Sequence, residues 1–185
     1  AVKRSFNAIT VDGDTSTNDT VLAFAAGAAL AEDQLGDLEE GLTAAMQQLA
    51  QAIARDGEGA TCLIEVQVEG AMDDASALLV ARTVCGSSLV KTAVHGRDPN
   101  WGRIVAAAGR SGVMFDPQAV ALWIGGHQLM QAGQPVAFDR DAASASLQQE
   151  KVFIRLLLGS GPGSGVGWGC DLSDQYVRIN ADYTT

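Results

Sequence analysis

Cysteine and histidine are scarce in this sequence of 185 residues, and neither is grouped. Cys62, Cys85 and Cys170 form no Cys-x-x-Cys pair, and His95 and His127 stand in no metal-ligand spacing. We therefore expect no bound metal. The pattern indicates buried free thiols in a reducing compartment, and so a cytoplasmic location.

Basic residues are also few, with 12 lysines and arginines against 22 aspartates and glutamates and a formal net charge of −10. A surface of that sign repels phosphate backbones and anionic lipid, so we expect no nucleic-acid and no membrane partner. The sequence has no apolar run of about 18 residues or more, and none is expected to span a membrane. It also begins at Ala1 without an initiator Met or the apolar stretch of a secretory signal. This start suggests prior processing, truncation or an omitted segment.

The common self-contained catalytic motifs are missing as well. The glycine-rich stretch 159–169 is not followed by Lys-Ser or Lys-Thr, so we interpret it as a surface loop rather than a phosphate-binding loop. There is no Gly-x-Ser-x-Gly, and neither histidine adjoins a serine or cysteine in a recognisable way. We therefore expect this chain not to carry a complete active site.

What is present is enough apolar sequence, 47%, for a sizeable core. Apolar periodicity predicts helices from Asp37 to Arg55, from Asp73 or Asp74 to Val84, and from Pro99 to Gly109. It predicts strands at 6–11, 62–69, 89–94, 151–158 and 176–180, and a strand or a helix at 21–27. Two further apolar stretches, 120–124 and 135–138, flank a turn-rich connection.

These elements alternate irregularly, and several strands follow one another too closely for helical crossovers. We therefore expect an α/β fold of the α+β type, with mixed, largely antiparallel sheets layered with helices. The only plausible division is near residue 116. It would separate a main lobe, 1–115, which contributes to the active-site cleft, from a smaller lobe, 116–185, whose tail returns to the substrate site.

Residues 12–20 form a dense polar run that must be a loop. Asp12, Asp14 and Ser16 alternate as in a calcium loop, but glycine is second rather than sixth and no glutamate is twelfth. Two readings stay open: a network of local side-chain turns, or a loop that lines a site.

Two other polar stretches could bind a ligand. Glu58 lies between two glycines at a helix-to-strand junction and could pair with a substrate ammonium group, or be a solvated loop residue. Residues 96–103 could grip an anion with Arg97 or Arg103 at a helix N-terminus, or form an Arg97–Asp98 or Asp98–Arg103 pair that fixes the turn.

Six segments together carry a family resemblance: SFNAITVDGDTSTNDT at 5–20, GEGAT at 57–61, LVKTA at 89–93, GRDPNWGRI at 96–104, CDL at 170–172 and INADYTT at 179–185. In order, and over nearly the whole chain, they resemble most of the β chain of the bifunctional ornithine acetyltransferases, or glutamate N-acetyltransferases, of arginine biosynthesis. The resemblance implies the fold shared by DmpA and these acetyltransferases.

In that family a precursor cuts itself before a threonine, which becomes the N-terminal nucleophile of the β chain. The threonine takes the acetyl group of N-acetylornithine and passes it to glutamate, and bifunctional members also accept acetyl-CoA as co-substrate. The α chain supplies the oxyanion hole, and the assembly is an α2β2 heterotetramer. Because this chain begins at Ala1, the resemblance implies that the nucleophile lies upstream and that no catalytic residue is present here.

The resemblance assigns substrate binding to Glu58, Asn180 and Thr185. Glu58 would face the amino group of the substrate, and the other two would add hydrogen bonds. No cofactor is implied. The sequence departs from the family at Cys62, where lysine is common, and at His95, where phenylalanine is common. Two alternatives remain: a related N-terminal-nucleophile aminopeptidase or amidohydrolase, and a non-catalytic subunit that docks through its acidic loop.

Overall fold

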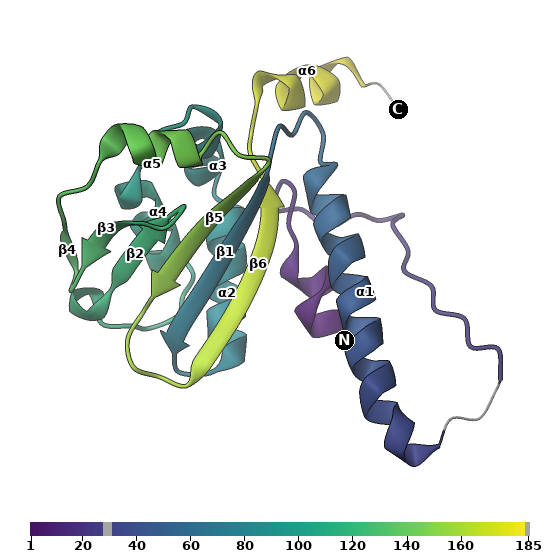
Figure 1. The fold of residues 1–185 in the computed structure, drawn as a ribbon. Helices are drawn as coiled ribbons and strands as arrows, with labels where there is room; N and C mark the ends of the chain where they lie inside the picture. Colours follow the sequence, from purple (N-terminus) through teal and green to yellow (C-terminus); the bar gives the residue numbers. More distant parts are fainter. Residues whose placement is uncertain (28–30, 184–185) are drawn as a thin grey trace.

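The computed structural model describes residues 1–27 and 31–183, and within them the strands form one six-stranded sheet (Figure 1). The strand order is β4-β3-β2-β5-β1-β6. The bounds are β1 Leu63–Ala71, β2 Ala121–Ile124, β3 His127–Gln131, β4 Gln134–Pro135, β5 Lys151–Leu157 and β6 Gly163–Cys170. Only the pair β1 and β5 is parallel in this sheet, so the predicted mixed, largely antiparallel arrangement is confirmed.

The helices lie beside this sheet and past one of its ends (Figure 1). They are α1 Leu35–Arg55, α2 Asp74–Cys85, α3 Ser88–His95, α4 Trp101–Gly109, α5 Arg140–Ser146 and α6 Asp174–Asp182. Short 3-10 turns occur at Val2–Arg4, Phe6–Ala8, Glu32–Gln34 and Pro117–Ala119. Asp73, one of the two caps that the sequence predicted for α2, accepts a hydrogen bond from the amide of Ser76.

The core lies between β1 and α2. Ile64, Val66 and Val68 alternate along β1, and all three are fully buried. They belong to the same apolar cluster as Val80 and Val84 of α2. Each such side chain contributes about 1.5–3 kcal/mol when it leaves water, so this face anchors the sheet. A smaller cluster of Ala8, Ala54, Leu63 and Trp168 joins the end of α1 to the start of β1.

The glycine-rich stretch 159–169 was wrongly interpreted as a surface loop, because most of it is strand β6. Its glycines recur at every second position, which places them on one face of the strand. A Cβ at Gly165 would lie 2.6 Å from the amide nitrogen of Leu78, and one at Gly167 would lie 3.0 Å from the carbonyl carbon of Ala81. The missing side chains let the backbone of α2 pack directly on β6.

Two predicted strands are helices. Residues 89–94 lie in α3, where Val90, Ala93 and Val94 are buried on one helical face. The β-branched residues of this short stretch favour a strand, and the sequence alone does not distinguish the two structures. Residues 176–180 lie in α6, which begins after Ser173. The hydroxyl of Ser173 accepts from the amide of Gln175, a cap that outweighs the strand propensity of the residues that follow.

The N-terminal segment differs from the prediction too. Residues 6–11 form a 3-10 turn and one bridge, between Ile9 and Trp168, instead of a strand. Residues 21–27 have no regular secondary structure. Helix α1 begins at Leu35, two residues before the expected cap Asp37. At α4 the cap is Asn100, so Pro99 precedes the helix rather than opening it.

The predicted lobe boundary at residue 116 stays a prediction. Strand β1, from 1–115, lies between β5 and β6, from 116–185, so both parts share the sheet. Among the described helices, no single one is long and apolar enough to cross a membrane. Only α2 and α3 taken together, with a bend of 58°, meet that length and composition.

Candidate functional site

Three segments meet where β1 begins and β6 ends. The two strands are antiparallel, with Leu63 opposite Cys170, so the turn before β1 lies beside the connection that follows β6. That connection leads into α6, which lies past this end of the sheet, near the loop between α1 and β1 (Figure 1). The stretch after the first 3-10 turns supplies Val11 and Asp12.

Glu58 and Asn180, two of the predicted binding residues, are in direct contact. The side-chain amide of Asn180 donates to the Glu58 carboxylate at 2.6 Å, and also to the carbonyl of Tyr176 at 3.0 Å. Both side chains are exposed, so the carboxylate remains open to a ligand. The third predicted residue, Thr185, lies outside the described residues.

Tyr176 and Asp12 extend this pair. The Tyr176 hydroxyl donates to the Asp12 carboxylate at 3.1 Å. Partial burial, and then the hydrogen bond and negative charge of Asp12, raise the pKa of Tyr176. The sequence raised the possibility that loop 12–20 lines a site, but it did not single out Tyr176, which was assigned to a strand. Further along the loop, Ser16 accepts from the amides of residues 18 and 19 in a local turn.

Asp171 holds the turn that carries Glu58. Its side chain is fully buried and accepts from the amide and hydroxyl of Thr61, both at 2.7 Å, and from the amide of Cys62 at 3.0 Å. His95 Nδ1 lies 2.7 Å from Oδ2 of the same carboxylate, the oxygen that also accepts from the Thr61 hydroxyl, and it donates to that oxygen, since an ionised carboxylate only accepts. The sequence offered no signal for this residue beyond its place in the Cys-Asp-Leu segment.

Burial alone would raise the pKa of Asp171, but the hydrogen bonds outweigh it. Those from Thr61, His95 and Cys62 stabilise the charged form and hold the pKa below its ordinary value. Asp171 is therefore a buried anion with four donors, an arrangement costly to lose.

Lys91 supports the same region from α3. It is buried, and its ammonium group donates to the carbonyl of Val11 and lies 3.4 Å from the sulfur of Cys170. It thereby fixes the main chain just before Asp12. Cys170 is buried as well, and a Cβ at Gly57 would come within 2.8 Å of its sulfur. The turn can approach β6 this closely only with glycine at that position.

Residues 96–103, the other candidate, form a corner held by side-chain contacts, and their suggested binding of an anion stays a prediction. Asp98 pairs with Arg140 at 2.8 Å and accepts from the side-chain amide of Asn100 at 2.9 Å. Arg103 instead donates to the carbonyl of Leu89. Over the part of the chain that the structure describes, neither pairing proposed from the sequence, Arg97–Asp98 or Asp98–Arg103, occurs.

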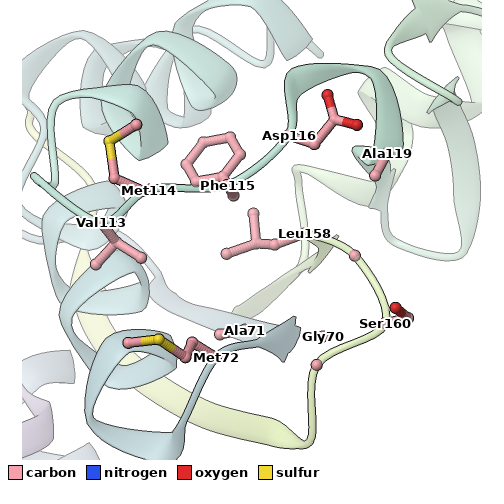
Figure 2. Close-up of a pocket in the computed structure, with 12 residues that line it drawn as sticks. Gly70, Ala71, Met72, Val113, Met114, Phe115, Asp116, Ala119, Leu158 and Ser160 are labelled. Atoms are coloured by element: carbon pink, nitrogen blue, oxygen red, sulfur yellow. The ribbon is translucent and has the colours of Figure 1, made fainter.

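In the described part of the chain, a cavity lies near each end of β1. The one in Figure 2 has a volume of about 380 Å³ and lies at the far end of β1, next to Ala71, Met72, Phe115 and Leu158. The nine residues of β1 separate it from the Glu58 turn by roughly 30 Å. The other, of about 480 Å³, is lined by Thr61 and His95 among others, and so adjoins the Asp171 cluster. No group of three or more potential metal ligands occurs in the described chain.

These features define an α/β protein with a mixed sheet and a carboxylate–amide pair at one sheet end. The chain belongs to the ArgJ family, whose model matches residues 1–185. The family resemblance inferred from sequence is thereby confirmed.

Similar proteins cover the whole chain. An "Arginine biosynthesis bifunctional protein ArgJ" of Parasynechococcus marenigrum is 77% identical over 185 residues, which are 100% of this chain and 45% of the relative. The protein of the same description from Prochlorococcus marinus is 68% identical over 98% of this chain and 44% of the relative. This chain thus spans about half the length of the curated relatives that it matches.

A solved structure agrees closely with the fold. The crystal structure of "Arginine biosynthesis bifunctional protein argJ" from Bacillus halodurans superposes with a TM-score of 0.95 at 44% sequence identity. The match covers 98% of this chain and 89% of that chain. The arrangement of sheet and helices is therefore that of the family.

Proposed function

We propose that this chain is part of a glutamate N-acetyltransferase that moves the acetyl group of N-acetylornithine to glutamate in arginine biosynthesis. Acetyl-CoA is a possible second acetyl donor. Family membership supports the class of reaction. The single observation that carries the substrate assignment is the 2.6 Å contact between Glu58 and Asn180, because it brings together two residues that lie 122 positions apart.

The chemistry of the pair suits an amino-acid substrate. The Glu58 carboxylate is exposed and can pair with an ammonium group, while the Asn180 amide orients it. Asp12 and the Tyr176 hydroxyl add an acceptor and a donor nearby. Thr185 is proposed to add a hydrogen bond.

The nucleophile of the proposed reaction is a threonine outside this chain. Its hydroxyl attacks the acetyl carbonyl of N-acetylornithine, the carbon–nitrogen bond breaks, and the hydroxyl proton ends on the departing amine of ornithine. The amine of glutamate then attacks the acetyl-threonine ester, which restores the hydroxyl. The role of Glu58 and Asn180 is to hold the amino acid while these bonds exchange.

We propose that the chain works with an α chain from the same precursor, released by autocatalytic cleavage, in an α2β2 heterotetramer. Helix α1 supports a partner, because five large apolar side chains along it are each at least 43% exposed: Leu35, Leu38, Leu42, Leu49 and Ile53. The three free, buried thiols are consistent with a cytoplasmic location, which is also part of the proposal.

We propose that the two parts of the chain on either side of residue 116 each contribute to the site. Glu58, from 1–115, would contribute the carboxylate to the cleft. The tail of 116–185, with Asn180, would return to the same place. The contact between the two residues supports this division of labour.

The decisive experiment uses the full-length protein and follows acetyl transfer from N-acetylornithine to glutamate. Glu58→Gln keeps the shape but removes the charge, so we expect the KM for N-acetylornithine to rise by about tenfold or more. Glu69→Gln is the matched control, since Glu69 pairs with Arg155 at the other end of β1. An unchanged KM in Glu58→Gln would remove this residue from the pocket. The chain without its upstream segment should show no turnover.

A further inference from the structure

The connection between β6 and α6 holds the Glu58 turn at two points. Asp171 binds Thr61 and Cys62 at the end of the turn. Two residues on, the Ser173 hydroxyl donates to the carbonyl of Gly59 at 2.6 Å. The turn is closed within itself by a bond from the amide of residue 60 to the carbonyl of residue 57, at 2.9 Å. Glu58 therefore lies in a short loop that Asp171 and Ser173 hold by hydrogen bonds to the residues that follow it.

The same connection also sets the position of Asn180. Helix α6 begins directly after Ser173, whose hydroxyl accepts from the amide of Gln175 while it donates to Gly59. A Cβ at Gly59 would lie 2.7 Å from the amide nitrogen of Tyr176, so the turn rests against the first residues of α6. Asn180 is about one turn past Tyr176 on this helix. The three-residue connection 171–173 thus sets the position of Glu58 relative to Asn180.

We infer that Asp171 is a positioning residue for substrate binding: its carboxylate, held by His95, fixes the turn of Glu58 relative to Asn180. This inference rests on the proposed role of Glu58 and deepens it. Asp171 acts through the turn, because its side chain is fully buried and touches Thr61, Cys62 and His95.

The choice of a charged residue supports positioning over packing. A buried carboxylate with four donors contributes no more stability than an apolar side chain of similar size would, because its desolvation offsets the hydrogen bonds. What it adds is a defined geometry, since the bonds from Thr61, Cys62 and His95 fix two segments, residues 61–62 and the end of α3, relative to the connection that carries Asp171. His95 is the partly exposed member, with 38% of its side chain accessible, and it shares Oδ2 of the carboxylate with the Thr61 hydroxyl.

The first arm of the test measures the turn itself in the full-length protein, by amide hydrogen exchange. In Asp171→Asn we expect the amides of Thr61 and Cys62 to exchange about tenfold faster or more, because each loses a charged acceptor. Asp73→Asn is the matched control, since Asp73 also accepts from a backbone amide but caps α2 at the other end of the sheet. That variant should leave the turn unchanged. Unchanged exchange at Thr61 and Cys62 in Asp171→Asn would overturn the inference.

The second arm asks whether the effect reaches the substrate through Glu58. We expect Asp171→Asn to raise the KM for N-acetylornithine by about 10- to 100-fold with a smaller change in kcat. Combined with Glu58→Gln, it should add little further, because both changes disable the same contact. A double variant whose KM equals the product of the two single effects would mean that Asp171 acts independently of Glu58, and the inference would be wrong.

A milder pair of variants covers the case in which Asp171→Asn fails to fold. Thr61→Val removes one hydroxyl bond to Asp171 and keeps the bulk, whereas Thr61→Ser keeps the hydroxyl. The valine variant should raise KM and the serine variant should restore it. Equal KM values in the two would count against positioning. A wild-type protein that transfers no acetyl group from N-acetylornithine would sink the proposed function, while the exchange measurement still decides whether Asp171 holds the turn.

Discussion

Asp171 accepts hydrogen bonds from both the amide and the hydroxyl of Thr61, each at 2.7 Å, although 110 residues separate the two in sequence. The contact ties the start of β1 to the end of β6, which are neighbours in the sheet. It is also the link through which the tail of the chain reaches the turn of Glu58. Several measurable consequences follow from this arrangement and from the packing around it.

The first concerns acid stability. Because the pKa of Asp171 is lowered from 3.8 in the folded protein, its stabilising contribution is present above that value and is lost as the pH falls through the lower folded pKa. We expect thermal unfolding scans from about pH 6 to about pH 2 to show a drop in Tm that is smaller in Asp171→Asn than in the wild type. Parallel curves for the two proteins would contradict this.

The second concerns the thiols. Burial raises the pKa of Cys62 and of Cys85 to about 12 and also raises the pKa of Cys170, although Lys91 opposes the shift in the last two. Thiolate is the reactive form, so at pH 8 these groups should react with an alkylating reagent far more slowly than a free thiol. Mass spectrometry should find them unmodified in the native state and modified after denaturation. Rapid native labelling of Cys170 would show that its surroundings open readily.

The third concerns the contact of α2 with β6. A Cβ at position 165 would meet the backbone of α2 at 2.6 Å, and backbone cannot move aside as a flexible side chain can. We expect Gly165→Ala to lower the free energy of unfolding by about 1–3 kcal/mol. Gly109→Ala is the control, because that position has open space and lies in α4, where alanine should add about 0.5–1 kcal/mol. Denaturant titration measures both changes.

The fourth concerns the exposed apolar face of α1. If the rest of the protein covers this face, Leu49→Gln with Ile53→Gln should weaken association by about 10-fold or more, since each buried side chain contributes about 1.5–3 kcal/mol. Leu89→Gln, on the exposed side of α3, serves as control. The measurement is the concentration at which the purified complex dissociates on dilution. Equal dissociation in all variants would mean that α1 does not contact a partner.

Much of the framework follows from local pattern. The alternation of Ile64, Val66 and Val68 predicts β1 because a strand presents every second residue to one face. The Asp73 cap and the apolar spacing behind it predict α2 for an equally local reason. The glycines of β6 led to a wrong prediction, because a glycine-rich stretch is usually a loop. The strand is explained by the close packing of the α2 backbone against these glycines, which only the structure shows.

Some features of the candidate site follow from the sequence, and others appear only in the folded structure. The sequence by itself determined the family, the covalent order of the motifs, and Glu58 and Asn180 as binding candidates. Tertiary structure alone decided that these two meet at 2.6 Å, that Tyr176 bonds to Asp12, and that Asp171 grips the turn. The physical reason is that each contact joins residues more than 100 positions apart, and such neighbours exist only after the antiparallel pairing of β1 and β6 brings the segment before β1 beside the segment after β6.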